Sequence, residues 1–231
     1  MNIFKRGIIA SSGGEPTNIV AFYEFLNNVN DSTGNYNGTA VGSPSYGTDR
    51  NSVANQAIVL NGTSQYITIA DDSFNSLDDF TIEIMVYFDG LTNVKRTIFA
   101  ALKTNGADQI GVYQQDSDGK IVYYCRIGAN TKYGYISNTV FSSASWKYLV
   151  WTKNGTTHRL YIDSVLDAST PFNETDKSKS FKDFTSPINY SFGVFRYGAT
   201  KIDYWDNKID FMRFRNIALT QSEITDIYNT L

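Results

Sequence analysis

The oxygen-bearing side chains of one early loop and one late strand are the residues best suited to chemistry. The loop from Asp31 to Gly38 carries carboxylate, amide and turn carbonyl oxygens, and calcium takes about 6–8 such hard oxygen ligands. In residues 209–214, strict alternation places Asp210 on the same side as Met212 and Phe214. If those side chains face the core, Asp210 is a buried carboxylate, which must be paired or metal-bound. The alternative is an Asx turn at the loop and backbone hydrogen bonds to Asp210.

Aromatic residues form a second group that could bind a ligand. The chain has 15 Phe, 16 Tyr and 3 Trp. Exposed aromatic rings stack on the apolar faces of sugars, while neighbouring amides and carboxylates bond to the hydroxyl groups. We expect four residues before the last strand to contact a ligand in this way: Tyr197, Tyr204, Trp205 and Asn207. Other candidate rings are Phe195, Tyr113, Tyr123, Tyr124, Tyr133 and Tyr135. The alternative is that most of these rings are core or cross-strand pairs.

Signatures of catalysis are weak. Glycoside hydrolysis needs two carboxylates flanking the scissile bond, but Glu83 has no acidic neighbour on its face of the expected strand. Asp78 and Asp79 are adjacent and are expected to point to opposite sides. His158 is expected at the surface, and Cys125 as a small buried hydrophobe. We therefore predict a protein that is not an enzyme.

Length, charge and cysteine usage exclude several classes. A chain of 231 residues is long enough for one all-β domain. The net charge of −3 and the lack of a Lys/Arg run argue against a nucleic-acid partner. No apolar run approaches the roughly 18 residues of a membrane span. One cysteine and one histidine exclude a disulfide framework and a multi-histidine metal centre.

Turn signals between β-type runs predict the elements that position these residues. Asn-Gly and Asp-Gly supply the positive φ angles of tight hairpin turns. We expect three hairpins, across residues 57–69, 110–125 and 146–163. Further strands are expected at residues 19–25, 80–88, 96–101, 188–195 and 209–214. The polar segment 169–185 is expected to be a long surface loop.

One helix is specified near the end of the sequence. Thr220 and Glu223 match a capping box, and Leu219 with Ile224 matches a hydrophobic staple. Many short antiparallel strands and this helix predict an all-β fold, an antiparallel two-sheet jelly-roll sandwich with one short C-terminal helix. We assign residues 1–14 to an N-terminal arm and residues 15–231 to the domain.

Five stretches, in order along the chain, together resemble the laminin-G-like, concanavalin A-like jelly-roll family. They lie at residues 20–39, 57–69, 79–86, 146–164 and 208–224. Met85 stands where the family usually has Trp, and Ser164 stands where it has Gly in a tight turn. The resemblance covers residues 19–90 and 145–230, and it implies the concanavalin A-like fold.

The resemblance also implies a site and a function. In that family, the loop after the opening strand and a late Asp commonly approach each other around a calcium ion. Asp31, Asn35, Asn37 and Asp210 are therefore the implied ligands of a structural calcium, some through backbone oxygen. The implied function is a non-catalytic binding or adhesion module that recognises a glycan or a cell-surface glycoprotein.

The expected setting follows from the start of the sequence. The family is normally found outside cells, but the first residues lack the apolar region of about 7–15 residues that a signal peptide needs. Cytoplasmic synthesis followed by assembly reconciles these facts. We therefore expect a location in a virion or at an extracellular surface, as a bacteriophage fibre, decoration or host-recognition protein. The arm at residues 1–14 would dock onto other virion subunits, with a disordered tail as its alternative.

Two other functions stay open at this point. One is a purely structural virion or assembly protein that binds only other protein subunits. The other, third in order, is a glycoside hydrolase of the same fold.

Overall fold

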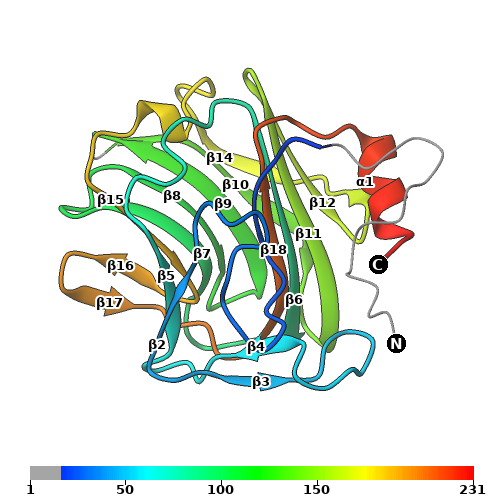
Figure 1. Cartoon of the computed structure of the whole chain (residues 1–231). Helices are drawn as coiled ribbons and strands as arrows, with labels where there is room; N and C mark the ends of the chain where they lie inside the picture. The colour runs from blue at the N-terminus through cyan, green and yellow to red at the C-terminus, as the bar shows by residue number, and fades with distance from the viewer. Residues whose placement is uncertain (1–16, 129) are drawn as a thin grey trace.

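Two large antiparallel sheets face each other across an apolar core (Figure 1). The computed structural model describes residues 17–128 and 130–231. The expected all-β sandwich with one short C-terminal helix is confirmed. The expected N-terminal arm at residues 1–14 lies outside the described residues.

The first sheet has β6 (Phe80–Asp89) at its centre, between β11 and β18. Its strand order is β13-β12-β11-β6-β18-β4-β3, and β1 also pairs with β18. The other strands of this sheet are β1 (Ile19–Tyr23), β3 (Ser45–Gly47), β4 (Ala57–Val59), β11 (Ala144–Asn154), β12 (Thr157–Ile162), β13 (Val165–Leu166) and β18 (Lys208–Arg215).

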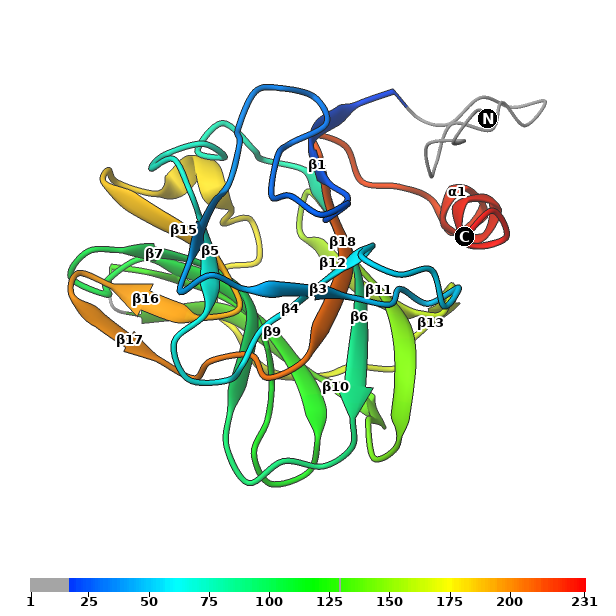
Figure 2. The same cartoon turned by 60° about the horizontal axis from the view of Figure 1, so that its bottom comes forward.

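The second sheet has the strand order β14-β10-β9-β8-β7-β15-β5-β2. Its strands are β2 (Thr39–Val41), β5 (Tyr66–Ile69), β7 (Arg96–Lys103), β8 (Gln109–Gln114), β9 (Lys120–Ile127), β10 (Asn130–Val140), β14 (Thr170–Glu174) and β15 (Ile188–Phe192). A separate hairpin of β16 (Phe195–Tyr197) and β17 (Thr200–Ile202) follows β15 and projects beside β7 (Figure 2).

The main core fills the space between the sheets, because alternate residues of each strand point inward. On β9, Tyr123 and Cys125 belong to this core, whereas Tyr124 and Arg126 lie on the opposite face. Aromatic rings from both sheets meet in the core, where Phe99 of β7 packs edge to face on Phe214 of β18 with their ring centroids 5.2 Å apart. The outward residues of β8 and β9 therefore share one face of the second sheet.

Two of the three expected hairpins are confirmed, and the third is wrong. β8 pairs with β9, and β11 pairs with β12. The segment 57–69 instead crosses between the sheets, because β4 pairs with β18 while β5 pairs with β15. The side-chain oxygen of Asn61 accepts hydrogen bonds from the backbone N–H groups of Thr63, Ser64 and Gln65. The Asn-Gly signal therefore marks a connection that turns out of one sheet and into the other.

The segment 169–185 was expected to be a loop and is partly ordered into elements. It contains the edge strand β14 and the short 3-10 helix η1 (Phe181–Asp183). β14 is mostly exposed, so its sequence has no apolar alternation to reveal a strand. Pro171 is tolerated there because an edge strand has one row of unpaired backbone groups.

The helix α1 (Gln221–Tyr228) covers the outer face of the first sheet (Figure 1). Its capping box is confirmed, since the Thr220 side chain accepts from the Glu223 N–H and the Glu223 carboxylate accepts from the Thr220 N–H. Leu219 and Ile224 are both buried in a second apolar cluster with residues of β6, β11 and β18. The helix is therefore held by packing as well as by its cap.

A buried ionic group lies on the same face. Glu83 accepts hydrogen bonds from Arg213 Nε at 2.8 Å and from Arg215 Nε at 2.7 Å, and Tyr148 donates to its other oxygen. All four side chains are at most 2% exposed. Burial alone would raise the pKa of Glu83, but the two guanidinium groups outweigh it and lower the pKa to about 2. Glu83 is therefore ionised at neutral pH and holds the two arginine side chains in place.

Candidate functional site

A cavity of about 540 Å³ opens on the outer face of the second sheet. Residues of β8 and β9, of the β16–β17 hairpin and of β14 contribute to its lining. Its lining residues are Lys95, Asn105, Gly106, Gln109, Tyr113, Tyr124, Arg126, Thr131, Phe172, Phe195, Tyr197 and Ile202. Aromatic rings and neutral polar groups make up most of this surface.

Four of the lining rings are partly exposed to solvent. Tyr113 meets Tyr124 edge to face at 5.9 Å, and Phe195 meets Tyr197 at 5.8 Å in the same manner. The Tyr124 hydroxyl donates to Oε1 of Gln109 at 2.9 Å. Burial raises the pKa of Tyr113 and of Tyr124, so both hydroxyls stay protonated at neutral pH. The cavity therefore offers ring faces and neutral hydrogen-bonding groups together.

Two glycines let these rings lie close to the sheet. A Cβ added at Gly111 would stand 3.0 Å from the Tyr124 ring. A Cβ at Gly134 would stand 2.1 Å from the Phe172 ring, so that ring would have to move away. Phe172 is 50% exposed, and it lies over the backbone of β10 because Gly134 has no side chain.

Charge in the cavity comes from two basic residues. The Lys95 ammonium lies 2.8 Å from the Asp203 carboxylate and over the rings of Tyr113 and Phe195. The Nε atom of Arg126 is shielded from solvent and has no hydrogen-bond partner among the described residues. None of the lining residues is acidic.

The four residues expected to contact a ligand have different positions. Tyr197 lines the cavity. Tyr204 and Asn207 do not; Tyr204 packs edge to face on Tyr66, and the Asn207 side chain accepts from the backbone N–H of Lys208. Trp205 was expected to be a sugar-stacking ring, and this is wrong. It is 1% exposed and packs in the core against Phe88, so it has no free face for a ligand.

Sequence reasoning missed several lining residues. Tyr113, Tyr124 and Phe195 were among the candidate rings but were not distinguished from core rings, and Arg126 and Phe172 were not considered. Alternation from the buried Cys125 would have placed Tyr124 and Arg126 outward. Phe172 carries no such signal.

The four expected calcium ligands belong to two separate hydrogen-bonded groups. The Asp31 carboxylate accepts five hydrogen bonds, from the backbone N–H groups of Phe22, Thr33, Asn35 and Tyr36 and from the Thr33 hydroxyl. The Asn37 side-chain oxygen accepts from the Asp31 N–H. This arrangement is the Asx-type turn that was the alternative interpretation.

Asp210 is buried, as expected, but it faces the other way. A bulge between Ile209 and Phe211 breaks the alternation of β18. Arg50 donates to the Asp210 carboxylate at 2.6 Å and also lies over the Phe211 ring, which belongs to the cluster beneath α1. Asp210 therefore lies on the outer face, away from the core that contains Met212 and Phe214.

The residues as arranged do not fit a calcium site. Donors of the chain already occupy the Asp31 carboxylate, and a guanidinium occupies Asp210. Within residues 17–128 and 130–231, no group of three or more His, Cys, Asp or Glu side chains is arranged to hold a metal ion. Whether the chain binds calcium has to be measured directly.

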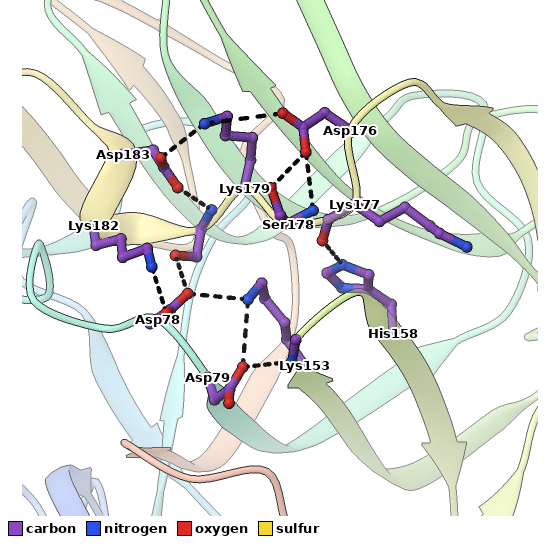
Figure 3. A network of polar contacts seen from close by, with 12 residues as sticks. Asp78, Asp79, Lys153, His158, Asp176, Lys177, Ser178, Lys179, Lys182 and Asp183 are labelled. Carbon is purple, nitrogen blue, oxygen red and sulfur yellow. Dashed lines mark hydrogen bonds and ion pairs between the residues drawn. The ribbon is translucent and has the colours of Figure 1, made fainter.

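A second polar cluster joins the ends of β6 and β11 to η1 (Figure 3). The Lys153 side chain is 1% exposed, and its ammonium group lies 3.2 Å from the Asp78 carboxylate and 3.4 Å from the Asp79 carboxylate. These carboxylates were expected to point to opposite sides, and this is wrong, because both precede β6 and strand alternation does not apply there. Hydrogen bonding from Lys182 is the main cause that lowers the pKa of Asp78. The cluster is a set of paired charges that fastens a surface segment.

His158 lies beside this cluster and is partly buried rather than fully exposed at the surface (Figure 3). Its ring lies 3.9 Å from the Tyr133 ring, and its Nε2 lies 2.9 Å from the backbone oxygen of Lys177. Its Nδ1 is buried with no partner among the described residues. Burial lowers the pKa of His158 to about 4.

The described residues form no helix with the length and apolar character that crossing a membrane would require.

The chain belongs to the concanavalin A-like lectin/glucanase superfamily. The family model that shows this matches residues 61–225. No curated protein sequence matches the chain.

Solved structures with the same fold include three kinds of binding domain. Domain 4 of AbnA, an extracellular GH43 arabinanase from Geobacillus stearothermophilus in complex with arabinotriose, is 21% identical, with a TM-score of 0.66 over 91% of this chain and 98% of that domain. The CBM40 of Ruminococcus gnavus IT-sialidase, bound to α2,3-sialyllactose, is 15% identical, with a TM-score of 0.62 over 75% of this chain and 96% of that one. The binding domain of botulinum neurotoxin serotype D/C is 13% identical, with a TM-score of 0.66 over 92% of this chain. The alignment spans 52% of the toxin domain.

Proposed function

We propose that the chain is a non-catalytic glycan-binding module whose site is the cavity on the outer face of the second sheet. The observation that carries this proposal is the arrangement of four partly exposed aromatic rings around Gln109 and two tyrosine hydroxyls. Sugars present apolar C–H faces and many hydroxyl groups, and this lining complements both. The arabinotriose and sialyllactose complexes of structures with the same fold support it.

Binding, rather than hydrolysis, is supported by the carboxylates of the described chain. A glycosidase needs one carboxylic acid whose pKa is raised and a second carboxylate across the scissile bond. No carboxylate lines the cavity. Those whose pKa departs from its ordinary value, such as Asp78 and Glu83, are shifted downward. Release of reducing sugar from any member of a polysaccharide panel would contradict this part of the proposal.

The test is a glycan array probed with the whole chain and with single variants. Tyr113→Ala and Tyr197→Ala each remove a lining ring, so binding of any recognised glycan should weaken about tenfold, or by ~1.4 kcal/mol. Tyr204→Ala is the matched control, because Tyr204 is also a partly exposed ring near the hairpin but does not line the cavity. Unchanged binding by both lining variants would exclude this cavity, and no binding by the unaltered chain would exclude the function.

The virion or extracellular-surface setting stays a prediction, as does docking of other virion subunits through residues 1–14. The alternative function, that of a purely structural assembly protein, predicts that the cavity is not open to solvent. In that case neighbouring subunits would cover it in the assembled particle. If it stays open to solvent there, recognition is favoured.

A further inference from the structure

We propose that the cavity recognises a sugar carboxylate and that Arg126 is its partner, an inference that rests on the proposed glycan-binding function. The ligand class is then a glycan that contains uronic or sialic acid. Three observations support this ligand class. Arg126 has no acidic partner in the cavity, its cross-strand neighbours are neutral, and none of the lining residues is acidic.

The Arg126 guanidinium lies in the cavity without a counter-charge. It forms no ion pair with an acidic side chain of the described chain, and its Nε is shielded from water with no hydrogen-bond partner there. A carboxylate bound in the cavity would supply the counter-charge that the described chain does not give the guanidinium.

The cross-strand neighbours of Arg126 do not supply a negative charge for its guanidinium group. In the second sheet Arg126 lies between Gln109 of β8 and Thr131 of β10, which are its cross-strand partners. Both line the cavity and both are neutral. The Gln109 side-chain oxygen already accepts from the Tyr124 hydroxyl.

Lys95, the second basic residue of the cavity, differs from Arg126 because it has an acidic partner. Lys95 is compensated by Asp203 at 2.8 Å, so its charge is already balanced within the chain. The whole chain carries a net charge of −3, so the unbalanced positive charge of Arg126 is a local feature of the cavity.

The guanidinium group favours a planar anion. Its N–H groups form a rigid fork that fits the two oxygens of a carboxylate, and such charge-assisted pairs are about twice as strong as neutral hydrogen bonds. The rings of Tyr113, Tyr124 and Tyr197 would meet the apolar face of the same sugar.

Calorimetric titration of the whole chain tests this inference with two matched pairs of probes. Trigalacturonic acid is compared with its methyl ester, and 3′-sialyllactose is compared with lactose. At least one acid should bind ten times more tightly than its neutral counterpart. The pair that shows the preference distinguishes a uronic from a sialic acid.

Three variants locate the preference. Arg126→Gln should remove it, and Arg126→Lys should retain part of it, because an ammonium keeps the charge but not the fork. Lys201→Gln is the control, since it removes the same charge from an exposed position on β17 that does not line the cavity. It should bind the acid as the unaltered chain does.

The possible failures are distinguishable. If the neutral probes bind as tightly as the acids, or Arg126→Gln keeps the preference, the carboxylate inference is overturned while the glycan-binding proposal stands. If neither these probes nor a wide glycan array shows binding, both are overturned. If Arg126→Gln does not fold, the comparison of acid with neutral probe on the unaltered chain decides.

Discussion

Burial among aromatic rings lowers the pKa of His158, and the hydrogen bond to the Lys177 backbone opposes that effect only in part. The neutral ring donates from Nε2 to the Lys177 carbonyl and packs against Tyr133 and Trp151, while Nδ1 is buried without a partner among the described residues. Protonation would place a second N–H where the described structure offers no acceptor. Burial of the ring, which disfavours the charged form, is the main cause that lowers its pKa to about 4, and the positive charges of Lys153 and Lys177 add to it.

This environment predicts a loss of stability in mild acid. As the pH falls from about 6.5 to about 4, the unfolded chain takes up a proton on His158 before the folded chain does, so the free energy of unfolding decreases by up to about 3 kcal/mol. Urea unfolding at several pH values measures it. His158→Phe should flatten the curve in this window, because His158 is the only histidine. An unchanged slope in the variant would contradict the assignment.

The carboxylates serve as an internal control for that measurement. The lowered pKa of Asp78 and of Asp167 means that their contribution to stability is present above the ordinary pKa of 3.8 and is lost as the pH falls through the still lower folded values. Their effect is therefore separated from that of His158 and should persist in His158→Phe.

Asp31 shows, also at the scale of the residue, why the calcium expectation and the structure diverge. Loops rich in Asp and Asn suit both a metal ion and an Asx-type turn, because both use the same oxygen atoms. Composition cannot separate the two, whereas the five hydrogen bonds to Asp31 can.

We accordingly expect removal of divalent metal to leave the thermal unfolding temperature unchanged. The measurement compares the chain in excess chelator with the chain in added calcium. A rise of several degrees with calcium, absent in Asp31→Asn, would instead establish a calcium site at this loop.

At the scale of the element, the turn between β12 and β13 carries an avoidable strain. Asp163 and Ser164 both have positive φ angles, 50° and 64°. The Asp163 carboxylate is used there, since it accepts from the Tyr148 N–H and from Lys147. Ser164 is the position at which the resemblance expects Gly, and Gly adopts this conformation without the steric cost.

Ser164→Gly should therefore stabilise the protein by about 0.5–1 kcal/mol and raise the thermal unfolding temperature by about 1–4 °C. Ser164→Ala is the matched control, because alanine keeps the Cβ that causes the strain. Equal unfolding temperatures for the two variants would show that φ is not the cause.

Elements with a local signal were predictable, and those defined by distant partners were not. The turns near Gly119 and Gly155 join strands that pair with each other. The strand-like runs and the turn residues between them were therefore enough to predict these two hairpins. After Asn61 the same signals lead into the other sheet, since the Gly62 N–H bonds to the Trp205 carbonyl from a distant part of the chain. The bulge in β18 likewise has no sequence marker, and it reverses the side of Asp210.

At the scale of the whole molecule, the two-sheet sandwich was predictable but the site only in part. Five motifs in order specify the sandwich, whereas the cavity needs the β16–β17 hairpin to fold back beside β7, which no motif encodes. Tyr197 was assigned from composition alone. Trp205 has a similar sequence environment and is buried, because the chain after the hairpin returns through the core toward β18.

The path of the chain from the β16–β17 hairpin back into the core has a consequence for the proposed ligand binding. The hairpin that walls the cavity begins and ends at buried residues, Val194 and Trp205, and the Trp205 N–H bonds to the Gly193 carbonyl to close its base at 2.9 Å. Gly193 has a positive φ, and a Cβ there would stand 2.2 Å from Leu60. Because both ends of the β16–β17 hairpin are held at buried residues, this wall of the cavity is pre-organised. A ligand would therefore bind without first having to order a flexible segment. For the proposed glycan, Trp205 would therefore contribute to affinity through the rigidity of this wall and not through contact with the sugar.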